Sequence, residues 1–153
     1  MVEVEVLYGD LAYSQLAPAH LVVPFLQKVF ALQGITSGEV SVLFASESVI
    51  KEMNMRFRNK NESTDILSFV QEEDDGFPVF EQNRYLGDII ISLEDAKRNC
   101  QKWGVDEQEE LQRLLIHGSL HLNGYDHQSN DSQEPMLIRQ EQMLKELQKE
   151  NWE

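Results

Sequence analysis

Cysteine is almost absent from this chain, because Cys100 is the only one among 153 residues. No intrachain disulfide can therefore form, and we expect a half-buried thiol on a helix. Long apolar runs are also lacking. The longest, near residues 21–30, is interrupted by Pro24, Gln27 and Lys28 and is too short for a membrane span of about 20 residues. The first residues show no basic segment followed by an apolar one. We expect a cytoplasmic protein with no membrane contact and no disulfide-linked partner.

Positive charge is the second scarcity. Thirteen lysines and arginines stand against 27 acidic residues, giving a formal net charge of -14, which taken alone argues against a nucleic-acid partner. The cations are unevenly spread, however, since four of the thirteen fall within ten residues: Lys51, Arg56, Arg58 and Lys60. Such a cluster is typical of a solvated helix end, but it also offers one local patch to a polyanion.

The length, with 41% hydrophobic and 26% charged residues, is typical of one folded domain, 1–153. Hydrophobic periodicity predicts strands at 2–6, 40–45, 65–70 and 85–92, and helices at 17–33, after Ser46, from Ser92 to Gly104, from Asp106 onward and at 133–150. Pro24 is expected to bend the first helix or to mark a late start. Residues 56–64 are expected to be irregular, and 72–82 an exposed connection. This order favours an α+β or α/β class with one small sheet.

Three of the four histidines lie in one motif, His117-Gly-Ser-Leu-His121-Leu-Asn-Gly-Tyr-Asp-His127. His117 and His121 are four residues apart on a predicted helix, which places both imidazoles on one face. In a continuing helix His127 would point away from them. Gly124 can end the helix in a left-handed conformation and reverse the chain, so we expect all three rings to converge on one metal ion.

Three protein ligands leave one tetrahedral position open, as in catalytic rather than structural zinc sites. An ion there would lower the pKa of bound water to about 7 and polarise a substrate oxygen, which favours hydrolysis. Zinc is the expected ion, although imidazole ligands also suit nickel, copper and iron. The fourth histidine, His20, is expected at a helix start or on the surface.

The histidine spacing matches that of the metzincin proteases, His-Glu-x-x-His-x-x-Gly-x-x-His, and predicts a zincin-like helix. The general-base glutamate of those enzymes would fall at Gly118, which has no proton acceptor. A peptidase of that type would therefore lack the group that activates its water.

The full stretch from His117 to His127 instead resembles the signature of the YbeY family of bacterial rRNA maturation endoribonucleases, His-Gly-x-Leu-His-Leu-x-Gly-Tyr-Asp-His. Two further blocks carry the resemblance: Met53-Asn54, Phe57-Arg58, Lys60 and Thr64–Phe69, and then Leu86–Ser92. The resemblance implies one α+β domain with a mixed sheet of about four strands and about five helices. It also implies zinc on the three histidines and cleavage of single-stranded RNA. The implied process is 16S rRNA 3′-end maturation and quality control on the small ribosomal subunit.

The resemblance also implies that Arg58 binds substrate and, with His117, is catalytic. A guanidinium suits the non-bridging phosphate oxygens and the charge that develops on them. The alternative for Arg58 is an ordinary loop arginine paired with Asp65 or Glu62. Asp65 and Asp88 are candidates for orienting a histidine N–H, or each caps a strand or pairs with a cation.

No general base is evident, and Thr64 or Ser68 would need one to act as a nucleophile. Beside the last ligand, turn chemistry accounts for Asp126 and core packing for Tyr125. Two other functions stay open. One is a different metallohydrolase, such as a peptidase or esterase. The other is a non-catalytic ribosome-assembly factor whose metal braces the fold.

Overall fold

The computed structural model describes residues 1–71, 84–127 and 129–148. Its four strands form one mixed sheet in the order β1-β2-β4-β3. The strands are β1 (Glu3–Tyr8), β2 (Glu39–Ala45), β3 (Ile66–Val70) and β4 (Tyr85–Ser92). The first, second and fourth are parallel, and β3 runs antiparallel to β4 along one edge. The sheet matches the expected fold class.

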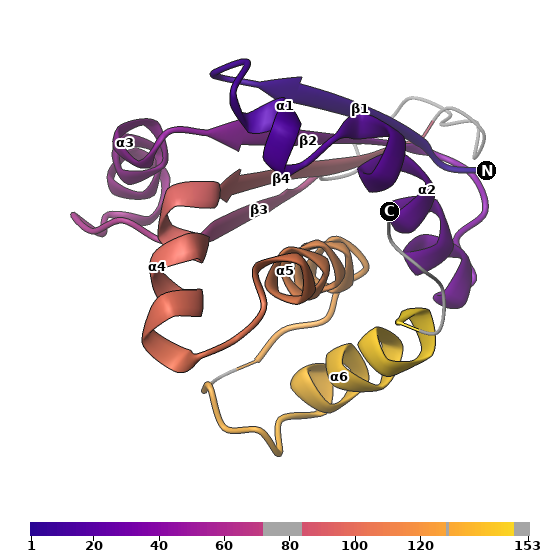
Figure 1. Ribbon diagram of the computed structural model, residues 1–153. Helices are drawn as coiled ribbons and strands as arrows, with labels where there is room; N and C mark the ends of the chain where they lie inside the picture. Colours follow the sequence, from indigo (N-terminus) through magenta and orange to yellow (C-terminus); the bar gives the residue numbers. More distant parts are fainter. Residues whose placement is uncertain (72–83, 128, 149–153) are drawn as a thin grey trace.

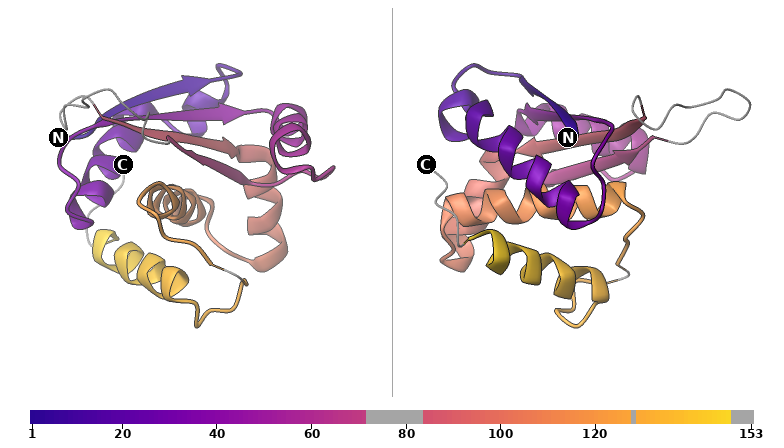
Figure 2. Two further views of the ribbon diagram at one scale, coloured as in Figure 1. Left: turned by 180° about the vertical axis from the view of Figure 1, so that it is seen from behind. Right: turned by 90° about the vertical axis from the view of Figure 1, so that its right-hand side faces the viewer.

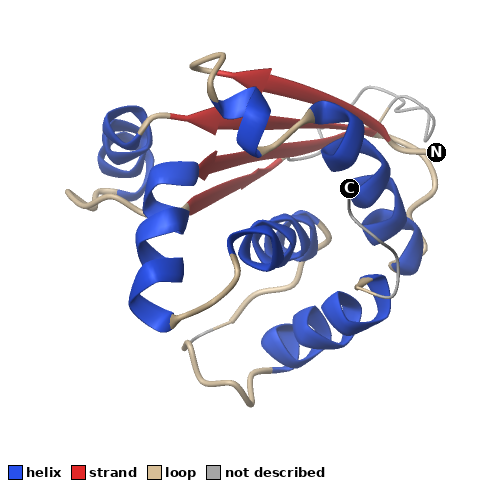
Figure 3. Ribbon diagram, viewed as in Figure 1, coloured by secondary structure: helices blue, strands red, loops and turns tan. Residues whose placement is uncertain are grey.

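Six helices surround this sheet among the described residues (Figure 3). They are α1 (Tyr13–Leu16), α2 (Ala19–Leu32), α3 (Glu47–Arg58), α4 (Leu93–Trp103), α5 (Glu107–Leu122) and α6 (Pro135–Leu147). In Figures 1 and 2, α5 lies directly against one face of the sheet, flanked by α2 and α4, and α6 packs on the outer side of α5. The α5 helix is thus enclosed by a sheet, two flanking helices and an outer helix.

Two apolar clusters stabilise this arrangement. The larger one joins the inner face of the sheet, including Ile89 and Ile91, to α2, α5 and α6. The smaller one, around Ile50, Leu67 and Ile90, joins the opposite face to α3. Side chains alternate between the faces of a strand, so neighbouring residues of β4 contribute to different clusters. This alternation decides which polar side chains of β4 can approach α5.

Most predicted helix ends are confirmed. The side chains of Ser46, Ser92 and Asp106 each accept a hydrogen bond from the backbone N–H three residues on, which satisfies one of the first four N–H groups of the helix. Gly104 ends α4 in a left-handed conformation with φ +67°. The predicted breaks therefore come from local backbone chemistry that the sequence carries directly.

The structure corrects or adds to the predictions at three places. Residues 56–58 are the last turn of α3 rather than irregular chain, and Asn59 ends the helix with φ 56°. Arginines suit that turn because the helix dipole is negative there. The α2 helix already begins at Ala19, so Pro24 lies inside it and does not mark its start. The single turn of α1 was not predicted, and the expected connection at 72–82 lies outside the described residues.

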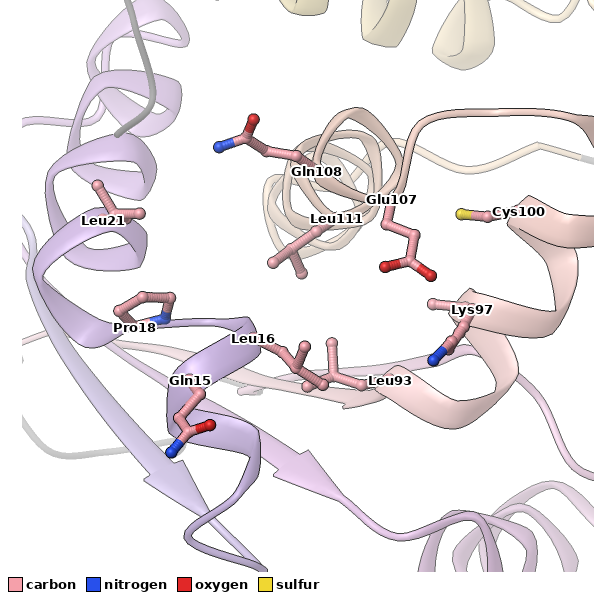
Figure 4. Close-up of a pocket in the computed structure, with 11 residues that line it drawn as sticks. Gln15, Leu16, Pro18, Leu21, Leu93, Lys97, Cys100, Glu107, Gln108 and Leu111 are labelled. Atoms are coloured by element: carbon pink, nitrogen blue, oxygen red, sulfur yellow. The ribbon is translucent and has the colours of Figure 1, made fainter.

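Cys100 is buried rather than half-buried, with 4% of its surface exposed, and burial raises the pKa of its thiol. It lines a largely apolar pocket of about 320 Å³ between α1, α2, α4 and α5 (Figure 4). His20 is exposed, as expected. In the part of the chain that the structure describes, every helix is too short or too polar to cross a membrane.

Candidate metal centre

The first two histidines lie one turn apart near the C-terminal end of α5. The Nε2 atoms of His117 and His121 are 3.1 Å apart, and their ring centroids are 4.7 Å apart. Two zinc–nitrogen bonds of about 2.0–2.1 Å that meet at a tetrahedral angle separate their nitrogens by about 3.3 Å. The spacing of the two nitrogens is therefore close to what one shared ion requires.

The chain reverses directly after this helix. Gly124 has φ +88°, and the N–H of Tyr125 donates to the carbonyl of Leu120 at 3.0 Å, which is the pattern of a glycine-terminated helix. The reversal returns His127 to within 5.2 and 5.5 Å of the other two rings, centroid to centroid. One nitrogen from each ring lies within 4.8 Å of the others. The predicted convergence of the three rings is confirmed.

Acceptors on the protein determine which nitrogen of two rings carries the proton. The Nδ1 atom of His117 lies 2.7 Å from Oε1 of Gln140, and that of His127 lies 2.8 Å from the backbone carbonyl of Ser129. A carbonyl oxygen can only accept, so Nδ1 is the donor in both rings. The lone pair is then on Nε2, the atom that each ring can offer to a metal.

Burial keeps two of the rings uncharged. It lowers the pKa of His117, although the hydrogen bond that the ring donates to Gln140 opposes this. Burial, and then the proximity of His117 and His127, lower the pKa of His121 to about 4. Neutral imidazole is the form that binds a metal. Three converging nitrogen donors, two of them held neutral, fit a divalent ion of the zinc type.

The histidines open onto a cleft of about 620 Å³ between α3, β3, α5 and α6. Arg58 and Lys60 line it from α3 and the loop that follows, and both are exposed. Within the described residues Arg58 forms no ion pair, so the expected alternative of pairing with Asp65 or Glu62 is not seen. The cleft therefore brings Arg58 and the three histidines together.

A second arginine of the cleft has a different environment. The guanidinium of Arg113 binds the carboxylates of Glu109, Glu110 and Glu141 at 3.0, 2.8 and 2.9 Å. These three carboxylates outweigh the single positive charge of Arg113, and the bond to Glu141 joins α5 to α6. Arg113 is thus occupied within the protein, whereas Arg58 remains available at the rim.

Of the alternatives for Asp65 and Asp88, the structure does not show the one in which they orient a histidine. Asp88 lies on the sheet face opposite α5, where its carboxylate accepts hydrogen bonds from Ser41 at 2.6 Å and from Tyr85. Asp65 lines the cleft, but its carboxylate accepts from Asn99 at 3.2 Å, and burial raises its pKa. No hydrogen bond joins either aspartate to a histidine among the described residues.

Among the described residues outside the histidine motif, Gln140 is the one whose side chain hydrogen-bonds to one of the three histidines, and it was not predicted from the sequence. It had one available signal: a polar residue at a position where α6 buries Met136, Met143 and Leu144. Tyr125 also differs from expectation, since it is 39% exposed rather than packed in the core. Asp126 behaves as expected, because its carboxylate accepts from the N–H of His127 at 2.8 Å within the turn.

Gly118 occupies the position of the missing metzincin glutamate for a structural reason. A Cβ atom built there would lie 3.0–3.1 Å from three side-chain atoms of Ile89 on β4. The glycine therefore allows α5 to lie close against the sheet. Ser68 is also notable, because its buried Oγ has no hydrogen-bond partner among the described residues and the residue lines the cleft. An unsatisfied buried hydroxyl in a polar cleft is suited to a ligand.

The fold and the site together define a class: α+β proteins with a zincin-like helix whose histidines, with a third beyond a glycine turn, form a group able to hold a metal. Comparison with known proteins identifies the family. Residues 12–148 match the family described as Endoribonuclease YbeY. The chain belongs to the YbeY family.

Individual relatives match this chain over most of their own lengths. A protein from Borreliella burgdorferi named Endoribonuclease YbeY is 44% identical over 131 residues, covering 80% of this chain and 82% of its own. One of the same name from Treponema denticola is 38% identical and covers 78% and 77%. The solution structure of TM1509 from Thermotoga maritima has a TM-score of 0.62 and 26% identity, covering 94% of this chain and 88% of its own.

Proposed function

We propose that residues 1–153 act as one domain and form a zinc-dependent endoribonuclease specific for single-stranded RNA. We further propose that it works in the cytoplasm on ribosomal RNA, in 16S 3′-end maturation and quality control of the small subunit. The relatives named Endoribonuclease YbeY support the activity. The observation that carries the proposal is that three converging imidazoles share one cleft with Arg58, which forms no ion pair with any other described residue.

In this proposal His117, His121 and His127 hold the ion through Nε2. Zinc with three protein ligands supplies Lewis acidity at an open position, which activates water and polarises a phosphoryl oxygen. The protein contributes geometry to this chemistry. The helix fixes two rings one turn apart, and the turn at Gly124 fixes the third. Loss of a ring is expected to remove the ion and the activity together.

Arg58 is proposed to bind the non-bridging oxygens of the scissile phosphate and to stabilise the charge that grows there. A side chain committed to internal carboxylates, as Arg113 is, could not do this. Lys60 lies on the same rim and adds a second contact to the backbone. Two rim cations on a chain of net charge -14 support weak binding of free RNA and favour recognition on the ribosomal particle.

The test is cleavage of a fluorescently labelled single-stranded RNA by zinc-loaded protein. Arg58→Ala is expected to lower the rate by about 10²–10³-fold, the scale for loss of one donor to a developing anion. His121→Ala is expected to abolish cleavage. Arg56→Ala is the matched control, because Arg56 lies in the same exposed turn of α3 but does not line the cleft. Cleavage at the wild-type rate in both Arg58→Ala and His121→Ala would show that the measured activity does not come from this site, and it would refute the proposal.

A further inference from the structure

Gln140 is a polar side chain on the buried face of α6. Only 6% of its surface is exposed, and its neighbours on that face are Met136, Met143 and Leu144. Burying an amide without partners costs free energy, so a glutamine at such a position needs both ends of its carboxamide satisfied. Its Oε1 lies 2.7 Å from Nδ1 of His117, across 23 positions of sequence.

The NH₂ group of the Gln140 carboxamide is bound by a charged side chain. Nε2 of Gln140 donates to Oε2 of Glu141 at 3.1 Å. That carboxylate is held in turn by Arg113, whose Nε and Nη2 donate to its two oxygens at 2.9 and 3.1 Å. A carboxylate can only accept, so it selects the NH₂ end of the amide. The Glu141–Arg113 pair therefore turns Oε1, and not Nε2, toward the imidazole.

The amide orientation has a direct consequence for the histidine. Because Oε1 can only accept, His117 must carry its proton on Nδ1 and present the lone pair of Nε2. That Nε2 faces its counterpart on His121 at 3.1 Å. With the amide reversed, the NH₂ group would face Nδ1 and favour the opposite tautomer, with the proton on the nitrogen that a metal needs.

We propose that Gln140 is a positioning residue that fixes the tautomer and ring orientation of His117, and that the Glu141–Arg113 pair acts through it. The C-terminal helix is then part of the metal centre although it supplies no ligand. This inference rests on the proposal that the three histidines hold a metal. Groups that orient a ligand histidine typically change metal affinity by 10–100-fold when removed.

The first measurement is zinc affinity, by competition with a fluorescent chelator. Gln140→Leu keeps the volume but removes the acceptor, and zinc is expected to bind about 10–100-fold more weakly. Gln140→Glu restores an acceptor for Nδ1–H but sets a second carboxylate beside that of Glu141, so it is expected to recover part of the affinity lost in Gln140→Leu. Glu141→Ala is expected to fall between wild type and Gln140→Leu. Gln142→Leu is the matched control on the exposed side of α6 and is expected to bind zinc as wild type does.

The second measurement does not depend on metal. Two-bond ¹H–¹⁵N correlation spectra of the metal-free protein at neutral pH distinguish the two imidazole tautomers. His117 is expected to be protonated on Nδ1 in wild type and in Gln140→Glu, and to shift toward the Nε2–H form in Gln140→Leu. Urea unfolding of each variant separates this effect from a general loss of stability.

The inference is overturned if Gln140→Leu retains both the wild-type zinc affinity and the wild-type tautomer. It is also overturned if affinity falls only in proportion to stability while the tautomer stays unchanged. Wild-type protein that binds no zinc would refute the proposed function instead. In that case the imidazole spectra would still decide whether Gln140 sets the tautomer of His117.

Discussion

Close packing between α5 and β4 at Gly118 can be tested with two substitutions. Gly118→Ala places a methyl group 3.0–3.1 Å from Cγ1, Cγ2 and Cδ1 of Ile89, which is fully buried. Ile89→Val removes the Cδ1 atom and so relieves one of the three contacts. The two single variants and the double variant form a cycle in which the coupling reports the contact itself.

The expected change in the free energy of unfolding for Gly118→Ala follows from two opposing effects. Alanine is favoured over glycine inside a helix by about 1 kcal/mol. Overpacking a filled core costs about 1–3 kcal/mol. The net expectation for Gly118→Ala is a loss of about 0–2 kcal/mol, although helix propensity alone predicts a gain. Ile89→Val alone is expected to cost about 0.5–1.5 kcal/mol, and the double variant to lose less than the sum of the two.

Urea unfolding followed by far-ultraviolet circular dichroism measures these free energies. A coupling of at least about 0.5 kcal/mol in favour of the double variant is expected, which is above the usual error of additivity. If Gly118→Ala instead stabilised the protein by about 1 kcal/mol, equally with isoleucine or valine at 89, the reasoning would be wrong. Glycine at 118 would then have no packing role.

Four other predictions concern the cleft and its surroundings. The first concerns salt. With two rim cations, a plot of the logarithm of the RNA binding constant against the logarithm of salt concentration should have a slope of about -1.4, and Arg58→Ala should reduce it to about -0.7. Equal slopes would contradict the role of Arg58. Burial raises the pKa of Asp65 in the folded protein. The protonated carboxyl is therefore tolerated at low pH, and the free energy of unfolding falls as pH rises through the pKa of the folded state. Asp65→Asn should therefore raise the free energy of unfolding at pH 7, with the gain fading toward pH 4; a loss at pH 7 in urea titrations would count against this. Gly124→Ala meets no atom within 4 Å but strains the left-handed backbone, so unfolding should become easier by about 1–2 kcal/mol and zinc affinity should fall in the same chelator assay. Chelation of the metal should lower the melting temperature yet leave the circular dichroism spectrum folded, because neither apolar cluster includes the histidines; unfolding on chelation would favour the fold-bracing alternative.

Local chemistry explains what could be predicted from the sequence. Caps at Ser46, Ser92 and Asp106 depend on residues within one turn. The convergence of three histidines depends on a helical spacing and one glycine. Because all these interactions are short in sequence, their patterns can be recognised without knowing how the elements pack.

Tertiary packing decided what could not be predicted. Ile89 is buried in the larger cluster, whereas Ile90, which lies on the same face of β4 as Asp88, is buried in the smaller one. Because both faces of β4 carry apolar residues, the sequence pattern did not show which face Asp88 occupies. Gln140 reaches His117 only because α6 folds back against α5. A buried glutamine was visible as an irregularity of the pattern, but its partner was not. The single turn of α1 is too short to show any period.

The three imidazoles all come from the short segment 117–127, whereas Arg58 belongs to α3 and Gln140 to α6. The segment that could hold a metal ion is therefore separate in sequence from the residues proposed to bind substrate and to orient His117. Under the two proposals, substitutions at Arg58 in α3 are expected to change substrate binding and those at Gln140 in α6 to change ion affinity, while segment 117–127 stays unchanged. Transplanting that segment alone into another helical scaffold should convey metal binding, but not catalysis.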